Sequence, residues 1–250
     1  MFDIFTYDFG YHWLISWGLT IPLALAVGIA AFAAWRGGPR WITVLAAVGI
    51  LWTVTGLVLV NVVVGINKPM AMPDARFLSS GSGRVLDAGA GSGRAAIGVL
   101  LARPGATLTA LDIYEGDFGI EGNSPERFMA NARIAGAAGR AVAQVGDMRQ
   151  MPFADATFDA VVSSYAIDHL NREGRSKAVA EVARVLKPGG DFLLSIVDAP
   201  WWTMLVSPPL AHHAKPDLAR WRALLEQHGF AIVDEGTQPM TRYWLARAGR

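Results

Sequence analysis

The chain has 250 residues, a formal net charge of +1 and no cysteine. This length allows one sizeable domain beside a smaller segment, and the balanced charge offers no field that would attract nucleic acid. The lack of cysteine excludes disulfides, thiolate zinc sites and cysteine nucleophiles. We expect neither a nucleic-acid partner nor a bound metal.

Two long segments near the N-terminus, 13–35 and 41–67, contain no charged side chain. Each is longer than the roughly 20 residues that a helix needs to cross the hydrocarbon core of a bilayer. Trp13, Trp35 and Trp41 stand at the edges of these segments, where aromatic rings favour a membrane interface. We therefore predict a membrane hairpin over residues 1–70, with helices at about 13–35 and 41–66. The alternative is a pair of buried core helices.

The two apolar segments are joined by a tight polar turn at 36–40. Ala26, Ala30 and Ala34 recur every four residues in the first segment, which would let the two helices approach closely. A lipid bilayer is therefore an expected partner, and a homo-oligomer through the membrane helices is a further expectation.

The region 74–250 alternates strand and helix patterns, which is typical of parallel βαβ units. The expected strands are 84–87, 107–112, 141–145, 158–163 and 191–197, followed by an antiparallel pair at 230–235 and 241–246. The expected helices are 93–102, 125–135, 173–186 and 216–228. The prediction is an α/β fold: a Rossmann-like seven-stranded sheet with helices on both faces, preceded by two transmembrane helices.

A glycine-rich loop, Asp87-Ala-Gly89-Ala-Gly91-Ser-Gly93, follows the first strand and opens a helix. Glycine lets the backbone turn sharply and approach a ligand without a Cβ in the way, and the helix N-terminus adds free N–H groups. The loop is a poor pyrophosphate site, because Arg94 stands where a dinucleotide fingerprint needs a small residue and no Walker Lys follows. A carboxylate at Asp87 would repel a pyrophosphate and suits a cationic amino group. This favours S-adenosylmethionine over a dinucleotide.

Polar residues follow the next three strands, at the sheet edge where ligands bind in doubly wound folds. Asp112 ends the second strand, where an acidic side chain can accept from both ribose hydroxyls. Asp147 follows the third strand and can accept from an adenine amino group while Met148 packs on the ring. Ser163 and Ser164 end the fourth strand, beside the glycine loop.

Several stretches occur in a characteristic order: Val-Leu-Asp87-Ala-Gly-Ala-Gly-Ser-Gly93, Gly146-Asp147-Met148, Met151-Pro-Phe153-Ala-Asp155, Phe158-Asp159-Ala-Val-Val and Glu181-Val-Ala-Arg184-Val-Leu-Lys-Pro-Gly-Gly190. Together they resemble the class I S-adenosylmethionine-dependent methyltransferases, particularly the small-molecule branch similar to the enzymes of ubiquinone and menaquinone biosynthesis. The resemblance covers residues 84–197 and leaves the acceptor open, because this branch methylates carbon, oxygen, nitrogen and other atoms. The cofactor contacts that these readings imply, with S-adenosylhomocysteine as the product, are Asp87, Gly89, Ala90, Gly91, Asp112, Ile113, Gly146, Asp147, Met148, Ser163 and Ser164.

Residues for the acceptor side are expected after the fourth and fifth strands. Tyr165, Asp168 and His169 follow the fourth strand, at the methyl end of the cofactor in the fold that the resemblance implies. They are the candidate catalytic residues, although Asp168 and His169 could instead cap the next helix. The candidate substrate-binding residues after the fifth strand are Asp198, Trp201 and Trp202. The two tryptophans could alternatively seat the domain on a bilayer surface.

The sequence departs from typical relatives in two places. The connection 113–124 is longer than usual and could form a lid over the cofactor, with Tyr114 as a substrate-binding candidate. The N-terminal apolar hairpin is the second departure, since most relatives lack one.

These features predict a membrane-anchored methyltransferase that transfers a methyl group from S-adenosylmethionine to a hydrophobic or membrane-partitioned small molecule or lipid. One alternative is a non-catalytic module of the same fold that assembles a membrane complex. Another is a nicotinamide-dependent reductase, which Arg94 disfavours.

The orientation in the membrane raises a conflict. Arg36 and Arg40 lie in the hairpin turn, and the positive-inside rule would place that turn in the cytoplasm. A cytosolic cofactor requires the opposite. We expect an integral protein of the inner (cytoplasmic) membrane with the catalytic domain in the cytoplasm and the two arginines snorkelling at the far face. A hairpin that enters one leaflet without crossing would also resolve the conflict.

Overall fold

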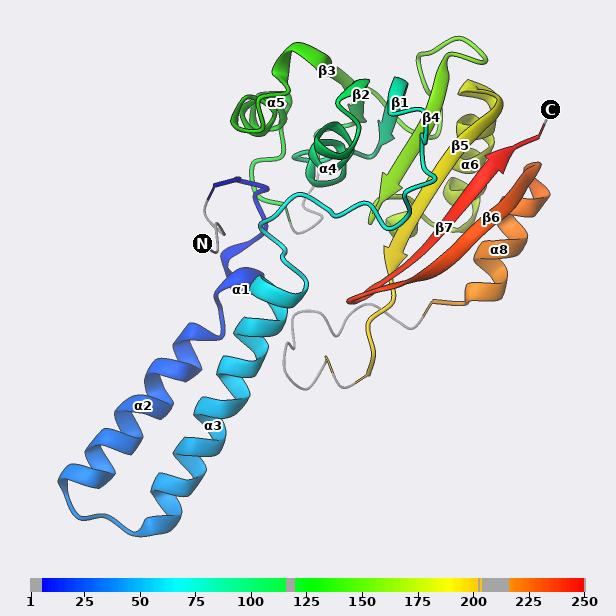
Figure 1. Ribbon diagram of the computed structural model, residues 1–250. Coiled ribbons are helices and arrows are strands. Elements are labelled where there is room, and N and C mark those ends of the chain that lie inside the picture. The colour runs from blue at the N-terminus through cyan, green and yellow to red at the C-terminus, as the bar shows by residue number, and fades with distance from the viewer. Residues whose placement is uncertain (1–5, 116–119, 202, 204–215, 250) are drawn as a thin grey trace.

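The computed structural model describes residues 6–115, 120–201, 203 and 216–249. Figure 1 shows a sheet covered by helices, with a pair of long antiparallel helices projecting from it. The strands are β1 (Ser82–Ala88), β2 (Gly105–Asp112), β3 (Ala141–Val145), β4 (Phe158–Ser164), β5 (Leu186–Val197), β6 (Phe230–Gln238) and β7 (Thr241–Ala248). The helical elements are α1 (Trp13–Ser16), α2 (Thr20–Trp35), α3 (Arg40–Val58), the π-helical η1 (Leu59–Val63), α4 (Arg94–Ala102), α5 (Pro125–Ile134), η2 (Ala138–Arg140), η3 (Ile167–His169), α6 (Arg172–Val185) and α8 (Leu218–Gln227).

The strands form one mixed sheet in the order β3-β2-β1-β4-β5-β7-β6. Strands β1 to β5 are parallel, and β7 runs antiparallel to both β5 and β6. The predicted α/β sheet and its terminal antiparallel pair are confirmed. The strand order reverses between β1 and β4, which is the switch point where ligands bind in open α/β sheets.

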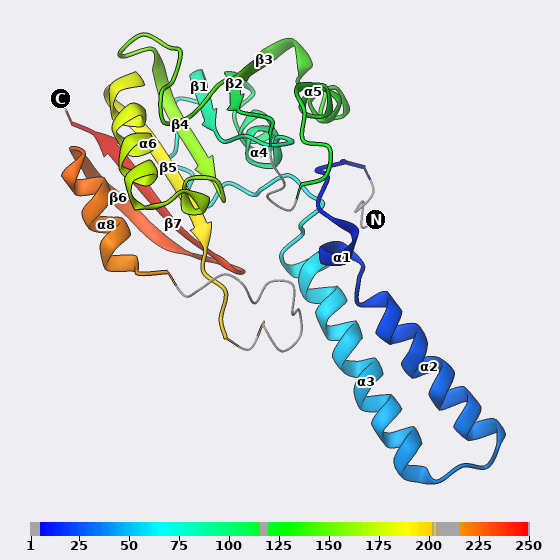
Figure 2. The same cartoon turned by 180° about the vertical axis from the view of Figure 1, so that it is seen from behind.

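The central strands of the sheet are buried on both faces, as the apolar runs in these strands require. Successive side chains of β1 point to opposite faces, so Val85 joins the core under α4 and α5 while Leu86 joins the core under α6 and α8. Figure 2, which shows the molecule from behind, places α6 beside β5 and α8 beside β6. The parallel strands end at one edge of the sheet, and that edge faces the projecting helices (Figure 1).

The first apolar segment is not the single helix that we predicted. The helix α1 ends at Ser16, and α2 begins at Thr20 and has 16 residues. Gly18 interrupts the helix, and the hydroxyl of Thr20 donates to the carbonyl of Trp17 at 2.6 Å, which starts a new turn. At 1.5 Å per residue α2 is about 24 Å long, which is shorter than a hydrocarbon core.

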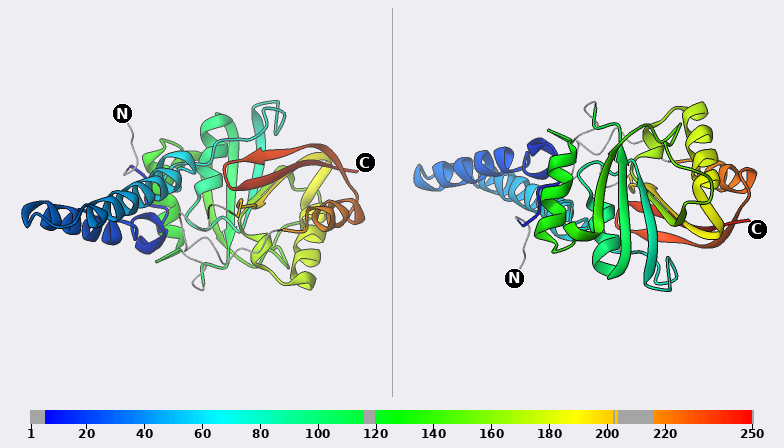
Figure 3. Two further views of the ribbon diagram at one scale, coloured as in Figure 1. Left: turned by 90° about the horizontal axis from the view of Figure 1, so that it is seen from below. Right: turned by 90° about the horizontal axis from the view of Figure 1, so that it is seen from above.

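The second apolar segment is helical, but it ends three residues before the predicted boundary. The α-helical turns of α3 pass into the π-helical turn η1, which ends at Val63. Figure 3 shows α2 and α3 extending away from the sheet side by side in both views. Small residues let them approach: Ala33, Ala46 and Gly56 are buried, and a Cβ placed on Gly49 would lie 3.5 Å from the Cβ of Ala26. Ala34, which we expected in this contact, is exposed.

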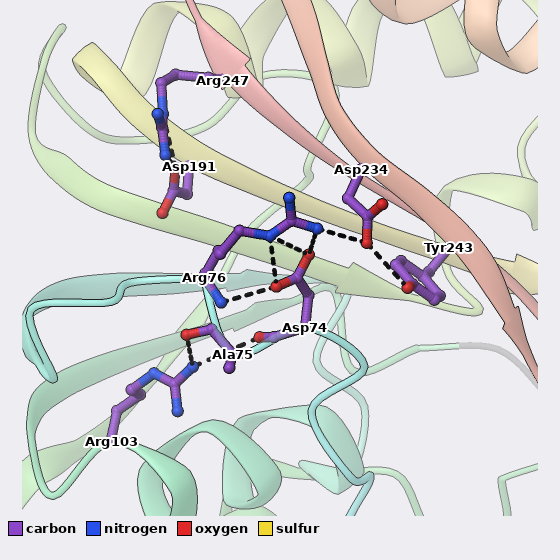
Figure 4. Close-up of polar contacts among 8 residues, drawn as sticks. All are labelled: Asp74, Ala75, Arg76, Arg103, Asp191, Asp234, Tyr243 and Arg247. Atoms are coloured by element: carbon purple, nitrogen blue, oxygen red, sulfur yellow. Dashed lines mark hydrogen bonds and ion pairs between the residues drawn. The ribbon is translucent and has the colours of Figure 1, made fainter.

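Charged groups fix the connection between the hairpin and β1 to the edge strand β6, as Figure 4 shows. The carboxylate of Asp74 accepts from Arg76 Nη2 at 2.7 Å, and the same nitrogen lies 2.7 Å from Asp234 Oδ2 in β6. These hydrogen bonds from Arg76 lower the pKa of Asp74. The guanidinium of Arg103 donates to the carbonyl of Ala75 at 2.9 Å. The hairpin is therefore joined to the sheet by a connection with a defined conformation.

Candidate functional site

The glycine loop turns sharply between β1 and α4. Gly89, Gly91 and Gly93 have φ of +81°, +52° and +90°, which side chains with a Cβ rarely adopt. A Cβ on Gly89 would also come within 2.3 Å of the Cβ of Ala166. The end of β2 holds the loop, because Asp112 Oδ2 accepts from the backbone N–H of Gly91 at 2.8 Å. The loop therefore presents its backbone to the space beside it.

Asp87, at the start of this loop, is a buried carboxyl group without a partner. Its exposed fraction is 1 %, and neither carboxylate oxygen accepts a hydrogen bond within the described part of the chain. Burial raises the pKa of Asp87 to about 8; the nearby backbone N–H of Ala96 opposes this shift, and the negative charge of Asp112 adds to it. A buried carboxyl group without a partner is costly, so its native partner is expected to come from a ligand. The ammonium group of an amino acid would satisfy it.

A cavity of about 580 Å³ lies beside the loop, which is within the range of small-molecule sites. Most of the predicted cofactor contacts line it. Two of the predicted catalytic residues, Tyr165 and His169, also line it. The predicted residues brought together here are Asp87, Gly89, Ala90, Gly91, Asp112, Ile113, Gly146, Asp147, Met148, Ser164, Tyr165 and His169.

Ser163 and Asp168 lie outside the lining of this cavity. Ser163 points the other way, and its hydroxyl donates to the carbonyl of Ala88 at 2.7 Å. Asp168 Oδ2 accepts from the backbone N–H of Val197 at 3.3 Å. The cap of α6 is Asn171, whose side chain accepts from Gly174, so the expectation of Asp168 as this cap is wrong. The reason is a short 3-10 turn, η3, between β4 and α6.

Of the residues expected to bind the acceptor, Tyr114, Asp198 and Trp201 do not line the cavity. Asp198 pairs with Arg242 at 3.5 Å, and Trp201 is 73 % exposed. The hydroxyl of Tyr114 is buried with no hydrogen-bond partner in the described residues, and burial raises the pKa of this phenol well above its usual range. Trp202 lies outside the described residues, as does part of the connection 113–124.

The carboxylate of Asp147 reaches the cavity but already has a partner. Arg149 donates to both of its oxygens, with Nη2 at 2.6 Å from Oδ2, and these hydrogen bonds lower the pKa of Asp147. A contact with adenine would use the remaining lone pairs of this carboxylate. The adenine contact of Asp147 stays a prediction, and so does the ribose contact of Asp112.

Several lining residues were missed by sequence reasoning. Tyr11 comes from the segment before the hairpin, and burial raises the pKa of its phenol while the nearby Arg94 opposes the shift. Arg94 had only been noted as a break in the dinucleotide pattern. Ile15, Val64 and Ile66 come from the base of the hairpin. No local sequence pattern marks these positions, because only the fold brings the hairpin base to the glycine loop.

Comparison with known proteins identifies the central part of the chain. Residues 86–194 match a family model described as a methyltransferase domain. The chain is 37 % identical over 120 residues to a malonyl-[acyl-carrier protein] O-methyltransferase of Methylococcus capsulatus, covering 48 % of this chain and 39 % of that protein. It is 32 % identical over 114 residues to the ubiquinone/menaquinone biosynthesis C-methyltransferase UbiE of Geobacter sulfurreducens, covering 44 % and 40 %. The chain thus spans about two fifths of the length of these relatives.

A solved structure gives the same fold. The 1,6-didemethyltoxoflavin-N1-methyltransferase of Burkholderia thailandensis, with bound S-adenosylhomocysteine, superposes with a TM-score of 0.50 at 20 % identity, covering 68 % of this chain and 72 % of that chain. At this identity the likeness speaks for the fold alone. With the family match, the unpartnered carboxyl group of Asp87 and the glycine loop, it leads to one conclusion. Residues 86–194 match the methyltransferase family in sequence, and the unpartnered carboxyl group of Asp87 beside the glycine loop fits the ammonium group of S-adenosylmethionine as methyl donor.

Proposed function

We propose that the whole chain is a methyltransferase anchored in the inner membrane, with its catalytic domain in the cytoplasm, and that its acceptor is a small apolar molecule or lipid that partitions into the bilayer. The observation that carries this proposal is the composition of the cavity. Beside the glycine loop, its wall includes apolar side chains from the hairpin base, among them Ile15, Val64 and Ile66. A water-soluble acceptor would gain nothing from such a wall.

The surface of the hairpin supports the membrane part of the proposal. Among the described residues, the stretch Arg40–Val63 is long and apolar enough to cross a membrane, with 24 residues and a mean hydropathy of 2.3. Most of the exposed large hydrophobic side chains in the described part of the chain lie between residues 13 and 63. Apolar patches of this extent on a soluble monomer are rare and mark contact with a membrane or a partner.

The tip of the hairpin has interfacial chemistry. Trp35 and Trp41 are 76 % and 63 % exposed at the two sides of the turn. The guanidinium of Arg36 lies 5.6 Å from the Trp35 ring centroid and 5.7 Å from that of Phe32. Such aromatic and basic residues are suited to a headgroup region. The short α2 favours a hairpin that tilts α3 or thins the bilayer locally, or one that enters a single leaflet.

The residues that line the cavity have different roles in the proposed reaction. S-adenosylmethionine, when bound, supplies a methyl group activated by a positively charged sulfur. Asp87 would bind the ammonium group of the cofactor, and the backbone of the glycine loop would lie against the cofactor. The domain then needs chiefly to align the acceptor and exclude water. Where the acceptor must lose a proton, His169 is the candidate base, since it lines the cavity.

The named relatives give a mixed but useful indication of the acceptor. One is named as an O-methyltransferase of a carrier-bound malonyl group, the other as a C-methyltransferase of ubiquinone and menaquinone biosynthesis. The two names differ in the atom that is methylated, so they leave that atom open for this chain.

The proposal is tested by incubating membranes that contain the chain with S-adenosylmethionine labelled with tritium in its methyl group. After extraction we expect the label in the lipid phase, and, at limiting S-adenosylmethionine, about a tenth as much or less with the Asp87→Asn variant. Label found only in protein or in the aqueous phase would refute an apolar acceptor. Total lipid extracts from several bacteria are then offered as acceptors. If no label is transferred to any lipid fraction, the result argues against catalysis.

A further inference from the structure

Two short segments at the hairpin base face both the outside and the cavity. In the first, Trp13 and Leu14 are 46 % and 52 % exposed, while the next residue, Ile15, lines the cavity. In the second, 62–66, two exposed valines precede Val64 and Ile66, which also line the cavity. The apolar surface of the hairpin is therefore continuous along the chain with the apolar wall of the cavity.

These two segments are tied to each other. Asn61 in η1 is buried, and its side-chain amide donates to the carbonyl of Ser16 at the end of α1 at 2.8 Å. The same amide nitrogen lies 3.1 Å from the carbonyl of Leu57. A π-helical turn such as η1 is costly and is frequently found at functional sites. The wall of the cavity is thus a built feature of the hairpin base.

The second segment is also tied to the glycine loop. Arg94 begins α4, directly after the loop, and its guanidinium donates to the carbonyls of Val64 at 3.0 Å, Gly65 at 3.3 Å and Lys68 at 3.0 Å. Val64 directly follows η1, so this cation also lies near the negative end of that helix. The positions of the hairpin wall and of the cofactor loop are consequently fixed relative to each other.

The segment before the hairpin covers the same cavity. Phe9 is buried and lines it, and the backbone N–H of Glu121 donates to the carbonyl of Gly10 at 2.7 Å. Asn131 in α5 both accepts from the backbone of Asp8 and donates to it, at 3.0 Å and 2.8 Å. The segment before the hairpin therefore closes one part of the cavity. The hairpin base forms the apolar part that lies next to the exposed apolar surface of the hairpin.

The chemistry of this side of the cavity defines a ligand. Its apolar side chains are Phe9, Ile15, Val64, Ile66, Val197 and Met240. The polar groups nearby are the phenols of Tyr11 and Tyr165, the imidazole of His169 and the guanidinium of Arg94, which already donates to backbone carbonyls. The hydroxyl of Tyr165 already contacts that of Thr241. Such a site fits an apolar body that carries one small polar head.

We propose that the hairpin base is the acceptor-binding site and its entrance. An apolar molecule with a single hydroxyl head, of the alkylphenol type, passes from the bilayer at residues 13–15 and 62–66 and lies against Ile15, Val64 and Ile66, with its head toward Tyr165 and His169. This inference rests on the proposed function, but it is tested by binding and not by turnover.

The probe is 4-pentadecylphenol with a diazirine in its alkyl chain, added to the full chain in nanodiscs of phosphatidylethanolamine and phosphatidylglycerol. After illumination, mass spectrometry locates the labelled residues. Excess 4-pentadecylphenol separates saturable labelling in the cavity from labelling of lipid-facing positions. The variants are Ile15→Trp and Val64→Trp, which fill the cavity, and the control is Ile29→Trp, which lies on α2 with 52 % exposure.

We expect saturable labelling at the hairpin base and near Tyr165 in the wild type and in the control. In each cavity-filling variant it should fall by about fivefold or more, since overpacking of this kind costs 1–3 kcal/mol, while the Ile29→Trp control keeps the labelling and the affinity for S-adenosylhomocysteine of the wild type. The inference is wrong if the hairpin base of the wild type shows no saturable labelling. It is also wrong if both cavity-filling variants are labelled as strongly as the wild type. If a variant loses its fold, the wild-type map alone decides. A wild type that fails to bind S-adenosylhomocysteine refutes the proposed function instead, whatever the labelling shows.

Discussion

The carboxyl group of Asp87 is expected to lose its proton when a cationic ligand binds beside it. In the free protein burial raises its pKa from 3.8 to about 8. Between these values the folded chain keeps a proton that the unfolded chain has lost, so this group makes the protein less stable as the pH rises. The slope is about 1.4 kcal/mol per pH unit, and it ends above pH 8.

A pH series of unfolding temperatures tests this. Without ligand, Asp87→Asn should gain stability relative to the wild type as the pH rises from 5 to 8, because asparagine has no proton to lose. Saturating S-adenosylhomocysteine should reduce the difference or reverse its sign in favour of the wild type, since its ammonium group pairs with the ionised carboxylate. Parallel stability curves for the two proteins across this range would show that Asp87 titrates normally.

The glycine loop gives a second prediction at the level of single residues. Gly89→Ala would place a Cβ in a left-handed conformation and against Ala166, so we expect cofactor affinity to fall by at least about tenfold. Gly139→Ala is the matched control, because its Cβ would meet nothing within 4 Å. Calorimetric titration with S-adenosylhomocysteine measures both. Equal affinities would mean that the loop does not approach the ligand.

Single residues were predictable from the sequence where a local motif fixes them. Asp87, the glycines and Asp112 follow strand ends at a fixed spacing, and the structure gathers them at one cavity. Ser163 and Ser164 show the limit, because neighbouring residues of a strand point to opposite faces and the sequence did not say which faces the ligand. Tyr11 carries no signal at all.

At the level of elements, the largest difference between sequence and structure is in the hairpin. Apolar length predicted helices correctly, but it could not locate the break at residues 17–19 or the π-helical turn η1. Uncharged residues surround both features, so hydropathy is uniform across them. Their positions follow from tertiary contacts such as that of Asn61 with Ser16.

Arg94 joins two elements, and its removal should affect both. Arg94→Met removes three hydrogen bonds to carbonyls at the end of the hairpin. We expect the free energy of unfolding to fall by about 2–3 kcal/mol, amide exchange at 64–68 to increase, and cofactor affinity to fall. Arg103→Met is the control, since Arg103 binds the carbonyls of Phe77 and Ala75 from the other end of α4. If Arg94→Met and Arg103→Met bind the cofactor equally well, Arg94 does not couple the hairpin to the glycine loop.

At the scale of the whole molecule, the sheet and the hairpin have opposite surfaces. The sheet domain buries its large side chains, whereas the hairpin exposes them. The edge of the sheet that carries the cofactor loop faces the hairpin, as Figure 1 shows, so a membrane around the hairpin would lie near the cavity. The sequence predicted both parts, but not that they share one cavity.

The membrane proposal predicts how the chain partitions. The double variant Ile29→Arg and Val48→Arg places charges on two exposed positions of α2 and α3, at a cost of about 2.5–3.5 kcal/mol each in a bilayer. We expect it to leave the membrane fraction on alkaline extraction, while the wild type stays. Val142→Arg, at an equally exposed position on β3, should behave as wild type. Identical partitioning of all three would remove the support for a membrane hairpin.

The most direct measurement of the central claim is a calorimetric titration of the full chain in nanodiscs with S-adenosylhomocysteine and, separately, with NAD. We predict one site for S-adenosylhomocysteine, no heat of binding for NAD, and an affinity for S-adenosylhomocysteine that is about 10- to 100-fold weaker in Asp87→Asn, from the loss of a charged hydrogen-bonding partner. Binding of NAD in place of S-adenosylhomocysteine, or an affinity for S-adenosylhomocysteine that does not depend on Asp87, would contradict the account.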